Sequence, residues 1–394
     1  MKKAIVEIFL LIIVLFGCVL IYGRSEPSQL TTLASGLHHS SNSTKDFFEQ
    51  AYGEVSTTRP TDPIAGITVN HHLLAPNLIA QEFSLVATDK PMTVLLISPN
   101  HFYRGSGGLI TSSYDWQTPY GVLQTDKSLV AKFAASGLVN IDEVPFEQEH
   151  GINNIVGFIK RSLPNAKFVP LIVKENLSDS EADQMAKKLT EILPQNALVV
   201  GSLDFSHYLT STAAMFHDTQ TLAVMNNFDY GRISRLDIDS HPGLRLLLKY
   251  FDLTGNKKFV ATSHENSSTI SGNYNLTETT SYINGYFTAG NDKPNNARTT
   301  LYVQGLTSQD RWKPDASQRL YQYNDAVVKA KPVGLEGYNL GSGPLAVGLV
   351  YGPELTDVYF FPLDITNHLI TLLPKNKADT ILMKLGLTEH IKIK

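Results

Sequence analysis

Cysteine is almost absent from this sequence, which has only Cys18 among its 394 residues. A single cysteine cannot form an intramolecular disulfide, and zinc modules built from cysteine clusters are excluded as well. Any metal site must therefore use histidine and carboxylate side chains. The sequence also lacks an excess of positive charge, because its formal net charge is −4 and its pI is about 6.3. Nucleic acid is not expected as a partner, since no basic surface is available to hold its phosphates.

The composition is that of a folded protein. Hydrophobic residues make up 42% of the chain and charged residues 18%, and 17 Tyr and 18 Phe provide sizeable cores rather than disorder. The length accommodates one large domain and a smaller one.

The sequence begins with a long apolar segment, residues 4–23, in which Glu7 is the one charged residue. About 20 apolar residues span a bilayer as a helix, and the lysines that precede this segment favour a cytoplasmic N-terminus. We therefore expect residues 1–23 to be a single-pass transmembrane anchor, with the body of the protein on the extracytoplasmic side. A lipoprotein anchor at Cys18 is the less favoured alternative, because apolar residues follow Cys18 where such proteins turn polar.

The next segment, residues 24–62, is rich in Ser, Thr and other polar residues. We predict a polar tether here, with a short helix at Lys45–Tyr52 and with His38 and His39 in solvent.

From residue 63 to 290, segments rich in Val, Ile and Leu alternate with segments that have apolar residues at helical spacing. This alternation predicts an α/β domain with a single, mostly parallel sheet flanked by helices. We expect its strands near residues 65–72, 92–100, 167–173, 196–206, 257–266 and 279–290. We expect its helices near residues 73–87, 127–138, 150–164, 178–193, 219–228 and 241–255.

After Gly290 the composition shifts to short, Gly- and Pro-punctuated segments that are typical of strands. Residues 296–394 are therefore predicted as a small, β-rich ancillary module that ends in a helix. Its sequence assigns it no chemistry.

Polar residues follow three of the predicted strands at their carboxyl ends: His71 and His72, His101, and Asp204 with His207. In open α/β sheets, the ligand crevice lies outside the carboxyl ends of the strands. Glu149 and His150 begin a predicted helix, where backbone N–H groups also point outward. The pattern predicts one shared polar site, although a single histidine at a strand end is more often a loop residue.

Histidine and carboxylate side chains without cysteine suit iron(II), and copper or zinc bind the same groups. Two histidines and one carboxylate with open positions are the non-haem iron(II) arrangement. The candidates for the third ligand precede the last predicted helix of the domain: Asp237, Asp239 and His241. Helix capping explains this stretch equally well, since Asp239 or Ser240 stands ahead of Pro242.

Six segments resemble the Memo family, also called AmmeMemoRadiSam system protein B, in order and spacing: NHHLL, ISPNHF, QTPYGVLQTD, EQEHGINNIVGFI, KFVPLIV and GSLDFSHY. That family is similar to the catalytic subunit of class III extradiol dioxygenases. The resemblance covers about residues 63–290. It implies a single α/β domain with a metal-type pocket at one edge of the sheet.

The resemblance also implies metal ligands. A Pro-His-Ala-Gly motif reads Asn70-His71-His72-Leu73 here and makes His71 the first ligand, and a Gly-Pro-Ser-His-His motif makes His101 the second. The family's third ligand is a cysteine before a helix, and this chain has none there. Asp239 is the expected substitute, and the alternative is that the metal has been lost.

Two further motifs of the family fall on Glu149-His150-Gly151 and on Leu203–His207. They imply four catalytic candidates: Glu149, His150, Asp204 and His207. The acidic residue that follows the family's Glu-His pair is Asn153 in this chain.

Two classes of function follow. The first is a metal-dependent, dioxygenase-like oxidoreductase acting on a small aromatic or related substrate, with His150 or His207 as general base. A hydrolase that uses metal-bound water is a second version of this enzyme. The second class is a non-enzymatic module at the cell envelope that binds a metal or a small ligand, because kinship of fold does not establish chemistry. Four aromatic residues either bracket a substrate or serve packing: Phe102, Tyr103, Tyr120 and Tyr208.

Overall fold

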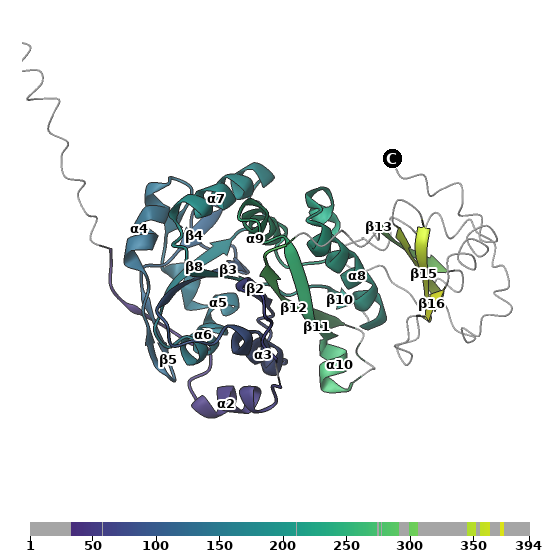
Figure 1. The fold of residues 1–394 in the computed structure, drawn as a ribbon, viewed down its shortest axis with the longest axis horizontal. Coiled ribbons are helices and arrows are strands. Elements are labelled where there is room, and N and C mark those ends of the chain that lie inside the picture. The colour runs from purple at the N-terminus through teal and green to yellow at the C-terminus, as the bar shows by residue number, and fades with distance from the viewer. Residues whose placement is uncertain are drawn as a thin grey trace, which may run out of the picture. The chain divides into compact units, whose positions relative to one another are not determined.

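The computed structural model of the chain describes residues 33–56, 58–209, 211–273, 276 and 278–290, and four strands between residues 299 and 373 (Figure 1). The predicted transmembrane anchor, residues 1–23, and the predicted C-terminal helix lie outside these residues. Within the described residues, no helix is long and apolar enough to cross a membrane.

A nine-stranded sheet forms the centre of the α/β domain, in the order β10-β12-β2-β9-β3-β8-β4-β7, with β11 paired to β12. Its strands are β2 (Ile64–Val69), β3 (Met92–Pro99), β4 (Leu109–Thr111), β7 (Asn140–Ile141), β8 (Ala166–Val173), β9 (Ala197–Ser202), β10 (His207–Leu209), β11 (Lys258–Asn266) and β12 (Thr279–Thr288). The central strands β2, β9, β3 and β8 are parallel, whereas β12 is antiparallel to β2 and β4 is antiparallel to β8. The sheet is therefore mixed but mostly parallel, as predicted.

Helices cover both faces of this sheet (Figure 1). They are α3 (Pro76–Val86), α4 (Lys127–Ala135), α5 (His150–Asn153), α6 (Val156–Ser162), α7 (Asp179–Ile192), α8 (Ser211–Asn227), α9 (His241–Leu253) and α10 (Ser267–Ser271), with 3₁₀ turns η1 (Val144–Glu147) and η2 (Tyr230–Arg235). Alternate strand residues face opposite ways, so Val94 packs in one core with Phe83 and Phe158. On the other face, Leu247 of α9 packs over Gly201, where a Cβ atom would lie 2.6 Å from its side chain.

The helix predicted over residues 150–164 is divided into α5 and α6. The N–H group of Ile155 donates to the carbonyl of Ile152 at 2.9 Å, which is the tighter spacing of a 3₁₀ turn. The side chain of Asn154 points away from the helix and donates to the carbonyl oxygen of His71 at 2.8 Å. This turn brings α5 close to the end of β2.

Part of the segment predicted as a polar tether is folded. Strand β1 (Leu37–His39) pairs in parallel with β5 (Asp115–Thr118), which pairs with β6 (Gly121–Leu123). The prediction that His38 is solvated is wrong, because its Nε2 atom lies 2.9 Å from a carboxylate oxygen of Glu143 and its side chain is buried against aromatic rings.

The predicted helix at Lys45–Tyr52 is confirmed as α2 (Lys45–Gly53). Phe48 is fully buried, with its ring 4.8 Å from the ring of Phe158 on α6. Glu49 of α2 forms an ion pair with Arg161 of α6, with 2.7 Å between a carboxylate oxygen and a guanidinium nitrogen. We call residues 37–53, which comprise β1 and α2, the N-terminal strap.

The region predicted as a β-rich module contains a four-stranded antiparallel sheet. Its strands follow one another in the order β13 (Thr299–Gly305), β14 (Leu345–Tyr351), β15 (Leu355–Pro362) and β16 (Thr371–Leu373).

Glu82 is a buried carboxyl group on α3 with little polar support. One of its oxygens accepts a hydrogen bond from Thr262, and its Oε2 atom has no hydrogen-bond partner in the described part of the chain. Burial raises the pKa of Glu82 from 4.5 to about 8. The folded state therefore keeps this proton up to about pH 8, whereas the unfolded chain releases it near 4.5, so stability falls as the pH rises between these values.

We predict that Glu82→Gln raises the free energy of unfolding at about pH 8, by on the order of 3 kcal/mol, and changes it little at about pH 5. Urea denaturation at several pH values measures this difference. Glu54→Gln, at an exposed glutamate, is the control and should leave the pH dependence as it is. Parallel pH profiles for the wild type and Glu82→Gln would contradict the prediction.

Candidate metal centre

The ends of three neighbouring parallel strands form the floor of the site. Strand β9 lies between β2 and β3. Ser202 at the end of β9 pairs in register with Val69 at the end of β2. The chain continues from β2 into His71 and from β3 into His101. The two histidines therefore approach each other across the end of β9, as the strand-end pattern predicts.

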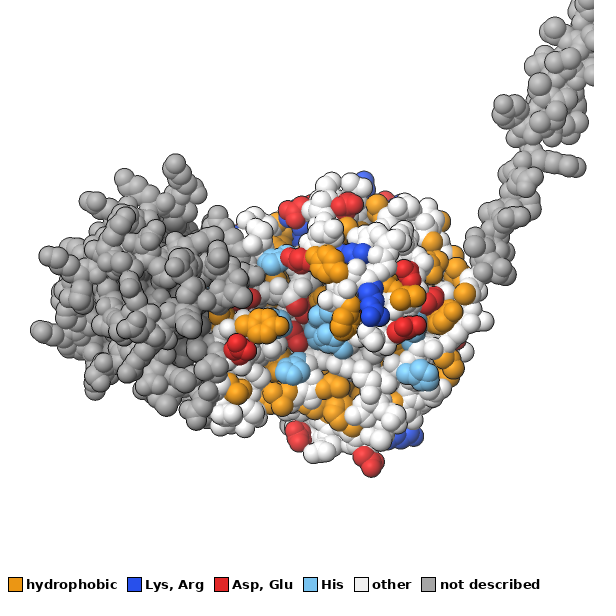
Figure 2. Space-filling model, turned by 180° about the vertical axis from the view of Figure 1, so that it is seen from behind, with side chains coloured by type: hydrophobic (Ala, Val, Ile, Leu, Met, Phe, Trp, Pro, Cys, Tyr) orange, Lys and Arg blue, Asp and Glu red, His pale blue; other side chains and the backbone are white. Residues whose placement is uncertain are grey.

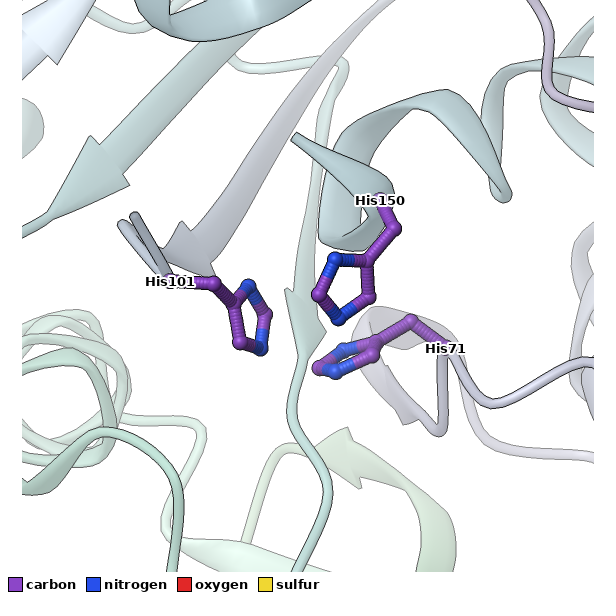
Figure 3. Close-up of side chains that lie close together, drawn as sticks. All are labelled: His71, His101 and His150. Carbon is purple, nitrogen blue, oxygen red and sulfur yellow. The ribbon is translucent and has the colours of Figure 1, made fainter. Parts of the chain in front are cut away.

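A third histidine joins them from the first turn of α5. His71, His101 and His150 each offer a ring nitrogen, and these three atoms lie within 4.8 Å of one another. Figure 3 shows the three rings turned toward a common space. The ring centroids of His101 and His150 are 3.9 Å apart, and those of His71 and His101 are 4.8 Å apart.

His101 is held by the fully buried carboxylate of Glu149. One oxygen of Glu149 lies 2.6 Å from His101 Nδ1, and the other accepts from the backbone N–H of His101 at 2.9 Å. The N–H of Gly151 also donates to Glu149, at 3.1 Å. Because a carboxylate only accepts, the proton of neutral His101 is on Nδ1, and the lone pair on Nε2 faces the site.

His71 has the same tautomer for a different reason. Its Nδ1 atom lies 3.2 Å from the Ser202 hydroxyl, and that hydroxyl donates its own proton to the carbonyl of Gly151 at 2.7 Å. Ser202 must therefore accept from His71, so His71 Nδ1 carries the proton. The Nε2 lone pair of His71 also faces the site.

Two buried aspartates face these lone pairs. The Nε2 atom of His71 lies 3.4 Å from Oδ2 of both Asp204 and Asp239, and the Nε2 atom of His101 lies 3.9 Å from Asp239 Oδ2. Asp239 Oδ2 accepts from the backbone N–H of Asp204 at 2.8 Å, whereas Asp239 Oδ1 has no hydrogen-bond partner among the described residues.

This donor set fits a divalent cation. Nitrogen lone pairs and carboxylate oxygens repel one another in a buried space unless a cation or a proton lies between them. Ligand atoms bound to one metal at about 2.1 Å lie roughly 3–3.5 Å apart, close to the spacing seen here. Burial and the neighbouring Asp204 raise the pKa of Asp239 far above its ordinary value, so ionised Asp239 needs a positive charge beside it.

Burial also favours the neutral forms of His71 and His150. It lowers the pKa of His71 far below the ordinary value, and the charges of His101 and His150 lower it further. It lowers the pKa of His150 to about 4, again with a contribution from His101. Neutral imidazole is the form that binds a metal or accepts a proton.

The other candidates for the third ligand are occupied elsewhere. His241 Nδ1 lies 2.5 Å from Glu175, and His241 Nε2 lies 3.0 Å from the carbonyl of Leu236. Asp237 faces His217 at 3.5 Å. The N-cap of α9 is Ser240, whose hydroxyl accepts from the N–H of Gly243. Helix capping therefore does not account for Asp239.

Exposed aromatic side chains follow the site histidines in the chain. Phe102 is 46% exposed with its ring 5.9 Å from that of His150, and Tyr103 and Tyr208 are 52% and 68% exposed. Tyr103 and Tyr208 have φ values of 54° and 57°, a strained conformation that is found most often at functional sites. Tyr120 lies elsewhere, since its hydroxyl donates to Glu49 of α2 at 2.6 Å.

Figure 2 shows a hollow in one face of the domain, with acidic and histidine side chains inside it and apolar side chains around it. His207 is partly buried, and its charge acts on His71. Burial lowers the pKa of His207, while the nearby carboxylates of Asp204 and Asp237 oppose this shift.

A model of the Memo-like protein family matches residues 40–283, which is more than half of the chain. The chain belongs to the Memo-like family. This confirms the resemblance carried by the six sequence segments, and it places the buried cluster of His71, His101 and His150 in a Memo-like domain.

Curated relatives are found in archaea and bacteria. The chain is 30% identical over 161 residues to a MEMO1 family protein of Methanothermobacter thermautotrophicus, which is 39% of this chain and 58% of that protein. It is 30% identical over 141 residues to a MEMO1 family protein of Aquifex aeolicus, which is 35% of this chain and 52% of that protein. The chain thus matches little more than half the length of these relatives.

A crystal structure of an uncharacterized protein from Escherichia coli K12 is also similar, with a TM-score of 0.37 and 12% identity. The similarity covers 56% of this chain and 99% of that one.

Asn153 stands where the resemblance implies an acidic residue, and its environment shows a structural role. The Trp116 indole N–H donates to Asn153 Oδ1 at 3.0 Å, and Asn153 Nδ2 donates to the carbonyl of Phe146 at 2.8 Å. The side chain thus joins β5 and η1 to α5 instead of facing the site.

Ser202 and Asn154 were not anticipated as parts of the site. Ser202 fixes the tautomer of His71, and Asn154 binds the backbone of the same residue. A serine at a strand end and an asparagine in a helix carry no charge or periodicity that singles them out, so local sequence gives no signal for either.

We predict that Glu149→Gln weakens metal binding about 10–100-fold. An amide cannot accept three N–H bonds as the carboxylate does, so the orientation and tautomer of His101 are lost. Competition with a chromophoric zinc chelator measures the affinity. Glu147→Gln, at an exposed glutamate nearby, should leave the affinity unchanged, and an equal loss in both variants would argue against an orienting role.

Proposed function

We propose that this protein is a membrane-anchored, metal-dependent oxidoreductase of dioxygenase type that acts on a small aromatic or related substrate. The metal is held by His71, His101 and Asp239. One observation carries the proposal. The Nε2 atoms of His71 and His101 lie 3.4 Å and 3.9 Å from Oδ2 of the buried Asp239, whose Oδ1 atom has no hydrogen-bond partner in the described part of the chain.

Two histidines with one carboxylate favour iron(II), and copper or zinc bind the same groups. Bound iron(II) supplies redox chemistry and a positive charge that offsets the buried carboxylates. The side chains of Glu149 and Ser202 orient the two histidine ligands through the hydrogen bonds described above. Asp204 positions Asp239 through its backbone N–H and lies beside His71.

His150 and His207 provide the proton acceptors. Both are less buried than His71, and both are neutral near pH 7 because burial lowers their pKa values. A neutral imidazole beside the metal can take the proton of a substrate hydroxyl group. Phe102 lies against His150 and offers an aromatic wall for the substrate.

The ligand set is tested with three variants of the full-length protein. We predict that Asp239→Asn lowers metal affinity more than about 100-fold, beyond the effect of losing a residue that only orients a ligand. Asparagine can still accept from the Asp204 N–H, so the fold is retained. His101→Ala should abolish stoichiometric binding, whereas His150→Gln should change the affinity only a few-fold.

Inductively coupled plasma mass spectrometry and chelator competition measure the metal content and the affinity. The reverse order, with His150→Gln more damaging than Asp239→Asn, would show that the three histidines are the ligands. A wild-type protein that binds none of iron, copper and zinc would refute the metal centre.

Turnover separates an enzyme from a binding module. We predict that the anaerobically iron-loaded wild type consumes oxygen in the presence of catechol and that His150→Gln or His207→Gln, in which metal is retained, lowers the rate about 100-fold or more. An oxygen electrode gives the rate. Metal binding without oxygen uptake would favour a non-enzymatic module that binds a metal or a small ligand at the cell envelope.

A further inference from the structure

His72 is a pocket histidine to which the proposed centre gives no role. It follows His71 in the turn after β2, and its side chain is exposed. Its Nδ1 atom lies 2.8 Å from the hydroxyl oxygen of Tyr282. Tyr282 on β12 is fully buried and packs in a small apolar cluster with Ala75 and Leu78. An exposed imidazole is therefore held by a phenol that is fixed by its own packing.

The Tyr282 hydroxyl is the donor in this contact. His72 Nδ1 is its one hydrogen-bond partner among the described residues, and a buried hydroxyl proton without an acceptor is costly. Burial, with the nearby charge of Asp204, raises the pKa of Tyr282 far above its ordinary value, so the phenol keeps its proton. Nδ1 of His72 therefore accepts, and neutral His72 carries its own proton on Nε2.

His72 directly follows His71 in the turn after β2, so it lies at the same end of the sheet as the pocket. Burial is the main cause of the low pKa of His150, and the charges of His101 and then of His72 lower it further. The charge of His72 also acts on His207, after larger effects of burial and of neighbouring carboxylates. His72 Nε2 has no hydrogen-bond partner in the described residues, so its N–H is available to a ligand.

The Nε2–H group of His72 is a hydrogen-bond donor, whereas the groups that face the proposed metal position are acceptors. Nε2 of His71 and of His101 and the carboxylates of Asp204 and Asp239 are acceptors, and they repel an anionic oxygen that does not lie on the metal. An N–H donor at the exposed end of the pocket would attract such an oxygen. A hydrogen bond to an ionised acceptor is about twice as strong as one between neutral groups.

We propose that the Nε2–H group of His72 binds an anionic oxygen, of a carboxylate or a phosphate, on the ligand of the metal centre. Tyr282 is the positioning residue that keeps the proton of His72 on Nε2. The proposal rests on the proposed function, because the ligand is the one bound at that centre.

The probe is inorganic phosphate, titrated by calorimetry into the zinc-loaded, full-length protein, with acetate as a second arm. We expect His72→Phe to weaken binding of phosphate, acetate or both about tenfold, as the loss of one hydrogen bond to a charged group predicts. His72→Gln should bind within about threefold of the wild type, because its amide N–H lies near the position of Nε2. Zinc affinity should be the same in all these proteins.

Tyr282→Phe has a spectroscopic readout. In the wild type, ¹⁵N spectra of labelled histidine should show His72 as the Nε2–H tautomer with a hydrogen-bonded Nδ1, and His72→Gln assigns the signal. In Tyr282→Phe the Nδ1 resonance should move to that of an unbonded ring nitrogen, and the probe affinity should fall about threefold or more.

Each outcome decides a different question. If zinc does not bind, the proposed metal centre fails. If zinc binds but His72→Phe binds both probes as the wild type does, or neither probe binds, the role of His72 alone is refuted. An Nδ1–H tautomer of His72 also refutes it, whatever the metal affinity.

Discussion

The contact between the buried carboxylate of Glu149 and His101 is the one on which the rest of the site depends. Glu149 receives two N–H groups from His101 and one from Gly151, so a single side chain fastens the end of β3 to the start of α5. Gly151 packs so closely against β3 that no side chain fits there, because a Cβ atom on Gly151 would lie 2.0 Å from Ser98 Oγ. The same contact sets the direction of the His101 lone pair and brings the ring of His150 beside it.

The carboxylate of Asp239, which we propose as the third ligand, would have a chemical consequence. The resemblance described above implies a cysteine at this position, and a thiolate is a soft ligand that suits copper(I). A carboxylate oxygen in its place shifts the preference toward iron(II) and zinc. Asp239 reaches the two histidines because its own oxygen and its N–H both bind the backbone of Asp204, which joins the start of α9 to the end of β9.

Local sequence predicts the strands and the residues that follow them, because runs of Val, Ile and Leu identify buried strands and parallel strands end at one edge. His71 and His101 were found in this way. The residue pattern alone did not choose among Asp237, Asp239 and His241, since that choice depends on contacts between distant segments, and only the resemblance to the Memo family favoured Asp239. His38 was misjudged for the same reason: the chain around it is polar, but its partner Glu143 is 105 residues away. Ser202 gave no signal, because its role is to accept a hydrogen bond from His71 while it donates another to the carbonyl of Gly151.

The N-terminal strap also constrains the order in which the chain can fold. Its β1 strand is synthesised early, yet it needs β5 as its neighbour and Glu143 as the partner of His38. The strap cannot pack in its native position until those later residues have been made. His38 and Phe48 therefore lack their native contacts during the first part of synthesis. Closure of the strap then joins η1 and α5 to the start of the folded chain, through bonds such as that from the Ser41 N–H to the Asn153 carbonyl. The segment that is translated first in this domain therefore cannot reach its final position before the residues around Glu143 and Asn153 have been made.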